Sequence, residues 1–244
     1  MSRRFRSVEA TLRALCAYHD HRVYGLDRIP SGPALIAFHH SLATYDSFLL
    51  AIPILDQLGR TLRGLADRLI FRTPGLGALF TGAGFVEGTR DATRRMLQQG
   101  ELIGLAPGGM REALRPSGAR YRFDWTDRRG FVRVAMEAGA PIVLAACPRA
   151  DDLYTVIGNP VTRRAYAAAR VPVPVAFGRL GTAIPRPVPL WHLLSEPLVA
   201  DVPPDRVTDR DVQHHHRRVV ARMTTLMAES LALGPAHDRH WSPR

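Results

Sequence analysis

The sequence predicts an α/β fold: a single domain with a mixed, largely parallel sheet flanked by helices. Short apolar runs of the kind found in buried strands alternate with segments of helical periodicity. Between residues 102 and 147, a strand, a helix and a second strand follow in the order of a parallel crossover unit. The 244 residues are an ordinary length for one such domain, and the 46% that are hydrophobic suffice for a core.

Apolar runs mark five expected strands, and the last of them is expected at an edge of the sheet. In chain order they cover residues 34–38, 62–66, 102–106, 141–147 and 193–199. Helical periodicity predicts helices over residues 47–58, 90–99, 130–138 and, less clearly, 163–170. Glycines that can end a helix stand just beyond the first three of these, at positions 59, 100 and 139.

The clearest helix is the last one. Thr208 and Asp211 form a start that resembles a capping box, and an apolar stripe continues to the neighbourhood of Gly234. Three consecutive histidines, residues 214–216, lie on this helix. Adjacent helical residues point in different directions, so these rings do not readily share one metal ion, and we expect them in solvent.

Two stretches are poor candidates for regular structure. Residues 71–85 are apolar but rich in glycine, which favours either a loop packed on the core or an apolar surface for lipid. Residues 170–190 carry five prolines, which rule out a regular helix there.

The ends of the chain differ from its centre. Residues 1–21 predict a basic amphipathic helix, and two alternatives fit it: packing on its own domain, or lying on a membrane surface with arginines toward anionic headgroups. Residues 22–234 form the expected main domain, and residues 235–244 a loose tail.

The formal net charge is +11, and every basic residue is an arginine because the chain has no lysine. Such a surface suits nucleic acid, an anionic membrane or a phosphorylated substrate. Aromatic residues are only 7% and do not alternate with arginine, so nucleic acid is the weakest of the three. Cys16 and Cys147 have neither metal nor redox spacing, and no signal peptide or spanning apolar run is seen, which together favour a cytoplasmic setting.

A histidine and an aspartate lie where the expected strand 34–38 gives way to the next helix. His40 leaves the strand, and Asp46 follows after five intervening residues. A neutral imidazole near a carboxylate is the usual apparatus for removing a proton from a hydroxyl, although such a pair also arises by chance. His39 is the competing base, but strand alternation turns it to the other side.

A second motif, Pro-Gly-Gly-Met-Arg-Glu at residues 107–112, follows the expected strand 102–106. Glycines at the end of a strand allow backbone to approach a phosphate closely, and the arginine that follows can bind one. We therefore assign the anion-binding block to residues 107–112.

These two motifs, in this order, resemble those of the lysophospholipid/glycerolipid acyltransferase superfamily. The five residues between His40 and Asp46, the block at 107–112, and the Gly-Phe helix from residue 130 are most similar to its diacylglycerol- and monoacylglycerol-acyltransferase-like branch. The resemblance covers roughly residues 20 to 230 and implies the fold of the glycerol-3-phosphate acyltransferases.

The resemblance implies transfer of an acyl group from acyl-CoA to the hydroxyl of a glycerolipid or other lipid alcohol. His40 would be the general base and Asp46 would orient it, without a covalent intermediate, a metal or a cofactor. The backbone N–H groups of Gly108 and Gly109 are candidate oxyanion donors. The alternative function is a non-catalytic lipid-binding protein of the same fold.

The resemblance also assigns the anion-binding residues and the partners. Arg111 would hold a phosphate of CoA or of the acceptor, Glu112 would orient Arg111, and Arg90 would contact substrate. The expected partners are acyl-CoA, a lipid acceptor and an anionic membrane surface on the inner face of the cell membrane. Residues 71–85 and 170–190 are candidate walls for the acyl chain.

Overall fold

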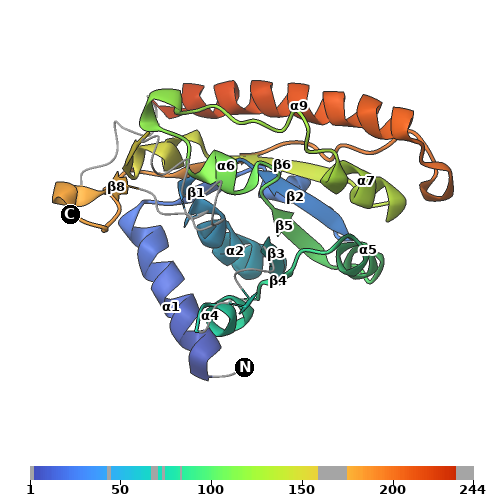
Figure 1. Cartoon of the computed structure of the whole chain (residues 1–244). Coiled ribbons are helices and arrows are strands. Elements are labelled where there is room, and N and C mark those ends of the chain that lie inside the picture. Colours follow the sequence, from blue (N-terminus) through green and yellow to red (C-terminus); the bar gives the residue numbers. More distant parts are fainter. Residues whose placement is uncertain are drawn as a thin grey trace.

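A seven-stranded sheet forms the centre of the computed structural model, which describes residues 3–42, 45–66, 71–72, 75–82, 84–158 and 175–234 (Figure 1). The strand order is β1-β9-β6-β2-β5-β3-β4. In that order the strands span Arg22–Tyr24, Trp191–Leu194, Ile142–Ala146, Ala34–Phe38, Leu102–Leu105, Leu62–Ala66 and Val86–Glu87. The five strands from β6 to β4 are mutually parallel, whereas β9 and β1 run antiparallel to them. The prediction of a largely parallel sheet is confirmed.

Helices cover both faces of this sheet. The α-helices are α1 (Arg3–Tyr18), α2 (Tyr45–Leu58), α4 (Leu76–Gly82), α5 (Arg90–Gln98), α6 (Gly109–Ala113), α7 (Gly130–Glu137) and α9 (Asp209–Ala232). Short 3-10 turns occupy Leu26–Arg28, Ser117–Ala119, Pro148–Asp152, Arg179–Gly181 and Pro204–Arg206. A separate antiparallel pair consists of β7 (Thr155–Ile157) and β8 (Val175–Phe177).

The core divides by the alternation of side chains along the strands. On β2, Leu35 and Ala37 pack with α5, α7 and α9, while Ile36 and Phe38 pack with α2 on the opposite face. All five residues of β2 are buried because this strand has helices on both sides and a strand on each edge. A strand buried on both faces needs apolar residues at every position, which accounts for the uninterrupted apolar sequence of β2.

Helix α9 begins as the sequence predicts. The Thr208 side chain accepts a hydrogen bond from the Asp211 N–H, and the Asp211 carboxylate accepts one from the Thr208 N–H, which completes a capping box. The prediction that the histidine triplet lies in solvent is wrong for two of its members. His215 and His216 are buried. The His216 ring packs against Phe131 of α7, and its Nε2 lies 2.9 Å from the Trp125 carbonyl oxygen. His215 lies toward the segment before α9, near the Leu198 backbone and the Asp201 carboxylate.

Two further expectations change, and two are not tested. The strand expected at the edge over residues 193–199 is β9, which lies between β1 and β6 inside the sheet. Residues 76–82, expected to be irregular, form α4. The helix expected over residues 163–170 and the tail at 235–244 lie outside the described residues.

Helix α1 packs on its own domain, the first of the two alternatives. Leu12, Leu15 and Cys16 join a buried cluster with Leu49 of α2, and the Arg13 guanidinium binds both carboxylate oxygens of Asp56 at 2.7 Å. The apolar side chains of Leu12, Leu15 and Cys16 are therefore engaged in packing within the domain. Within the described residues, no helix combines the length and the apolar character required to cross a membrane.

Candidate active site

The two sequence motifs meet at one edge of the sheet. Strands β2 and β5 are parallel neighbours, with Ala37 opposite Leu105, so their carboxyl ends lie side by side. His40 follows the end of β2, and Glu112 lies on α6 just after β5. The backbone N–H of His40 donates a hydrogen bond to Glu112 Oε1 at 2.6 Å. This bond joins motifs that are far apart in the sequence.

The His40 ring has one nitrogen fixed by the backbone. Its Nδ1 lies 2.8 Å from the Ser41 carbonyl oxygen. Because a carbonyl oxygen only accepts, Nδ1 carries the proton in the neutral ring, and Nε2 is the basic nitrogen. Burial lowers the pKa of His40 below its ordinary value of 6.5, against the opposite effects of the Ser41 carbonyl and the Asp46 charge. The ring is therefore neutral at neutral pH.

Asp46 lies in the first turn of α2 and is fully buried. The Ser41 hydroxyl donates to its Oδ1, and its Oδ2 lies 3.5 Å from His192 Nε2. Burial raises the pKa of Asp46, but His192, His39 and Ser41 together outweigh this effect and bring the pKa below its ordinary value. The carboxylate is therefore ionised at neutral pH.

Asp46, which we expected to orient His40, makes no hydrogen bond to the His40 ring in the described structure. Ser41 stands between them: its carbonyl accepts from the His40 ring, and its hydroxyl donates to Asp46. The reason is that both carboxylate oxygens are directed elsewhere, one to Ser41 and the other toward His192. Asp46 acts on His40 through its charge and through the position of Ser41.

A chain of polar groups continues behind Asp46, from the buried His192 to the half-buried His21 and Cys16. His192 Nδ1 lies 2.9 Å from His21 Nε2, and His21 Nδ1 lies 3.8 Å from the Cys16 sulfur. Asp46, Cys147 and His192 also bring potential metal-ligating atoms within 4.8 Å of one another. His39 is fully buried, and its two ring nitrogens have no hydrogen-bond partner among the described residues. His39 therefore faces the interior, as alternation predicts.

The Glu112 carboxylate accepts several hydrogen bonds, and its position accounts for the glycine at residue 108, the first glycine of the motif. Its carboxylate accepts from the His40 N–H and from Trp125 Nε1, the latter at 3.1 Å. Burial raises its pKa to about 7, against these hydrogen bonds and the nearby Arg115. A Cβ at Gly108 would lie 1.7 Å from Glu112 Oε2, so only glycine fits there.

The expected contact between Glu112 and Arg111 is wrong. Arg115, three residues after Glu112 and just beyond the end of α6, is the arginine beside Glu112, at 3.9 Å, and it also binds both oxygens of Asp151 at 2.6 Å. Arg111 instead extends into solvent with 72% of its side chain exposed, and its Nη2 lies 3.6 Å from Asp124 Oδ2. Successive positions on a helix point in different directions, which separates these side chains.

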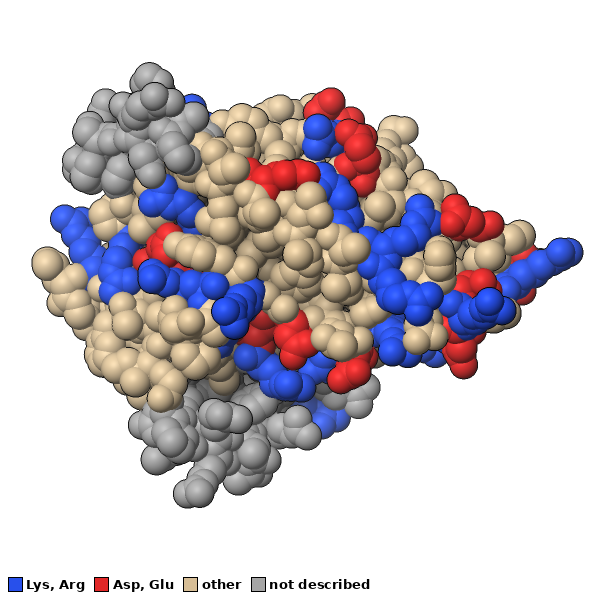
Figure 2. All heavy atoms as spheres, turned by 90° about the horizontal axis from the view of Figure 1, so that it is seen from above, with Lys and Arg blue, Asp and Glu red and all other residues tan. Residues whose placement is uncertain are grey.

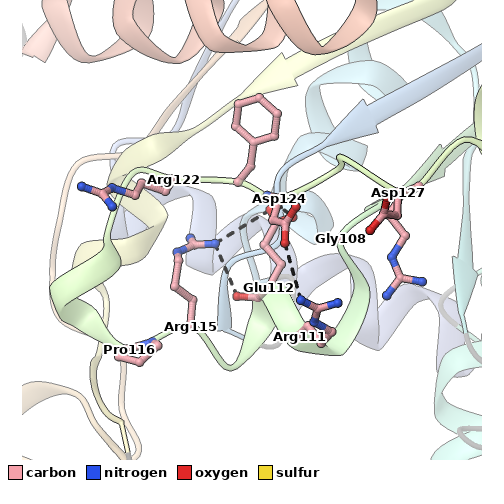
Figure 3. A pocket seen from close by; sticks show the side chains of 10 residues that line it. Gly108, Arg111, Glu112, Arg115, Pro116, Arg122, Asp124 and Asp127 are labelled. Atoms are coloured by element: carbon pink, nitrogen blue, oxygen red, sulfur yellow. Dashed lines mark hydrogen bonds and ion pairs between the residues drawn. The ribbon is translucent and has the colours of Figure 1, made fainter. Parts of the chain in front are cut away.

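A pocket of about 320 Å³ opens beside Glu112 (Figure 3). It is lined by Gly108, Glu112, Pro116 and Phe123, by the arginines 111, 115, 122 and 128, and by the aspartates 124 and 127. Within the described part of the chain, the Arg122 and Arg128 guanidinium groups have no ion-pair partner. They lie in the polar stretch between α6 and α7. Four arginines around one pocket give it the chemistry to bind phosphate groups.

One proposed oxyanion donor is already engaged. The Gly109 N–H donates to the Ala106 carbonyl at 3.2 Å, so of the two candidates only the Gly108 N–H is open in the described structure. Arg90 also lies elsewhere: it starts α5 after the cap residue Thr89 and lines a different pocket, with Arg129 and Arg210. The structure does not bring Arg90 into the pocket that contains Arg111.

Sequence reasoning missed Ser41, Arg115 and His192. Ser41 lies inside the first motif, and Arg115 follows Glu112 by the three residues of a helical turn, so both had a local signal. His192 had none, because its approach to Asp46 depends on β9 entering the sheet beside β6.

Comparison with known proteins relates the chain to acyltransferases and to enzymes named for lipid synthesis. The family model described as Acyltransferase matches residues 20–147. The cattle and human proteins named "DGAT1/2-independent enzyme synthesizing storage lipids" are 29% and 33% identical to the chain over 218 and 186 residues, or 87% and 75% of it. The chain spans 64% and 55% of the length of these relatives.

A solved structure shows the same fold. The 1-acyl-sn-glycerophosphate acyltransferase PlsC from Thermotoga maritima aligns with a TM-score of 0.56 at 13% identity. The alignment covers 91% of this chain and 78% of that chain.

Proposed function

Because the chain belongs to the Acyltransferase family, we propose that it transfers a fatty acyl group from acyl-CoA to the hydroxyl of a glycerolipid or another lipid alcohol. One observation carries the proposal: the His40 backbone is hydrogen-bonded to Glu112, on the wall of the arginine-lined pocket. A candidate base is thus fixed beside a candidate phosphate site.

In the proposed reaction, His40 Nε2 takes the proton of the acceptor hydroxyl. The hydroxyl oxygen attacks the thioester carbonyl carbon, the C–S bond breaks, and the CoA sulfur leaves with the proton returned by His40. The negative charge of Asp46 stabilises the imidazolium formed between these steps, and Ser41 holds the ring. The Gly108 N–H is the candidate donor to the oxyanion.

The pocket arginines would bind the phosphates of the substrates. Arg111, Arg122 and Arg128 are exposed on its wall and suit the phosphates of CoA or of a phosphorylated acceptor. The relatives named for storage-lipid synthesis support a lipid acceptor. A lipid acceptor places the proposed reaction at a membrane surface, and we retain the inner face of the cell membrane as the proposed location.

The test is incubation of the purified protein with labelled acyl-CoA and a panel of lipid alcohols, with products identified by mass. His40→Ala is expected to lower the rate at least about 100-fold, the usual contribution of a general base. His214→Ala is the matched control, because this histidine is exposed on α9. Acyl transfer that survives in His40→Ala, with His214→Ala equally active, would overturn the mechanism.

A further inference from the structure

An exposed apolar surface lies on the small sheet and on the loop that follows it. Its four large side chains are Ile157 (48% exposed), Phe177 (41%), Leu180 (92%) and Ile184 (58%), here called the apolar knob. Single exposed apolar residues are normal on protein surfaces. In the described residues, however, the one other large apolar side chain this exposed is Val199, so the exposure is concentrated in the knob.

The two strand residues of the knob share one face. In the antiparallel register, Thr155 pairs with Phe177 and Ile157 pairs with Val175. Side chains alternate along a strand and paired residues point the same way, so Ile157 and Phe177 lie on the same side of the sheet. Both are exposed, whereas Val156 and Ala176, which point to the other side, are half-buried.

The loop that carries Leu180 and Ile184 is held by its own hydrogen bonds. The Arg179 N–H donates to the Ile184 carbonyl and the Gly178 N–H to the Thr182 carbonyl, both at 2.7 Å. Leu180 has a φ of +52°, a left-handed conformation that is costly for leucine. A leucine fixed in this conformation at almost full exposure contributes nothing to the core. The loop therefore presents an apolar side chain outward.

The stretch of chain that carries the knob contains arginines but no acidic residue. Between Asp152 and Glu196 the chain carries no acidic residue. Arg179, beside Leu180, is exposed and has no carboxylate partner among the described residues. Apolar side chains next to an unpaired arginine complement a bilayer surface with anionic headgroups, in which the apolar groups enter the acyl boundary and the cation remains at the headgroups.

The knob is fixed to the rim of the candidate active site. The Val156 N–H donates to Ser117 Oγ at 2.8 Å, and a Cβ at Gly158 would lie 2.9 Å from the ring of Pro116. Pro116 lines the arginine-rich pocket. A surface that engages the knob is therefore brought close to the pocket entrance.

We propose that the apolar knob docks the protein on an anionic lipid bilayer, with Leu180 and Ile184 entering the boundary between headgroups and acyl chains and Arg179 contacting the headgroups. This inference deepens the proposed function, since it identifies the surface from which a lipid acceptor would reach the pocket. The docking itself is a binding property that is measured without acyl transfer.

The test is flotation of the full chain with vesicles of phosphatidylcholine mixed with phosphatidylglycerol, and with vesicles of phosphatidylcholine alone. The double variant Leu180→Ser/Ile184→Ser is compared with Val199→Ser, which removes a similarly exposed apolar side chain outside the knob. Wild type and Val199→Ser are expected to float with the mixed vesicles, and the double variant to bind them about tenfold more weakly. Arg179→Gln is expected to weaken binding to the mixed vesicles only.

One further measurement tests whether the variants are folded. Thermal unfolding of each variant is expected to match wild type, because the substituted side chains are exposed. The proposal is overturned if wild type does not float, or if the double variant floats as well as Val199→Ser. A protein that docks through the knob but transfers no acyl group would refute the proposed function alone.

Discussion

At the scale of single residues, Ser41 is the link between the candidate base and the buried acid. Its carbonyl fixes which nitrogen of His40 is basic, and its hydroxyl binds Asp46. An aspartate that acts through an intervening residue still supplies charge at short range, which is what the proposed imidazolium requires. The gap of five residues in the motif leaves room for this arrangement.

The pH dependence of the proposed reaction follows from His40. A base must be neutral to act, and burial places the pKa of His40 below 6.5. We therefore expect kcat/KM to be constant near neutral pH and to fall as the pH drops through a value below 6.5, while Asp46 stays ionised. The measurement is kcat/KM across the stable pH range. An acid limb with its midpoint above 6.5 would contradict a buried, neutral His40.

Gly108 offers a test of the contact between the motifs. In Gly108→Ala, the new Cβ would collide with the Glu112 carboxylate, which in turn holds the His40 N–H. We expect a loss of about 1–3 kcal/mol in unfolding free energy, typical of overpacking, together with reduced activity. Chemical denaturation and the acyl-transfer assay measure the two effects.

The control for this variant is Gly118→Ala. Gly118 lies in the loop after α6, and a Cβ there has no neighbour within 4 Å. Its stability and activity should equal those of wild type. If Gly108→Ala behaves in the same way, Glu112 can move without cost and does not position His40.

The sequence allowed the positions of the site residues to be predicted better than their contacts. His40 and Gly108 were identified because each follows a strongly apolar strand, and such strands are recognisable locally. The partners of Glu112 and Asp46 were not, because they depend on where side chains point after α6 and β9 have packed. A motif therefore predicts which residues gather but not which pairs form.

At the scale of elements, helix α9 provides a direct measure of capping. Thr208→Ala removes the side chain that accepts from the Asp211 N–H, and we expect a loss of about 1 kcal/mol in unfolding free energy. Thr225→Ala, an exposed position in the middle of the same helix, is the comparison and is expected to be neutral or slightly stabilising. Equal losses in the two variants would show that the capping box contributes no stability of its own.

Elements were predictable in proportion to their local signals. The bounds of β2 and β3 were correct, and the start of α9 carried its capping pattern. The interior position of β9 was missed because strand order is set by long-range pairing, which a local apolar run does not encode. Helix α4 was missed because its glycines oppose helix formation, and tertiary packing overrides that preference.

At the scale of the whole molecule, the positive charge is dispersed. In the view of Figure 2, arginines lie among carboxylates instead of forming one unbroken field. Several are paired on the surface, including Arg13 with Asp56, and Arg218 with Asp201 at 2.6 Å. A net charge of +11 therefore does not by itself produce a surface that follows a nucleic-acid backbone.

This dispersion leads to a prediction about nucleic acid. Any binding to duplex DNA should be non-specific and should disappear at an ionic strength of roughly 0.15 M. Fluorescence anisotropy with labelled duplexes across a salt series measures it. Tight binding that persists at that salt concentration would favour a nucleic-acid partner over a lipid one.

The pairing of β2 with β5 has a consequence for how such a site can vary. Ala37 pairs with Leu105. His40 and Gly108 each follow these residues by three positions, so the register places them close together. The segment between the two strands can lengthen or shorten without moving either point, provided that the register is kept. A slip of one residue would invert the faces of the strand and part the His40 N–H from Glu112. The number of residues between the two motifs can therefore vary, whereas the register between β2 and β5 must be kept.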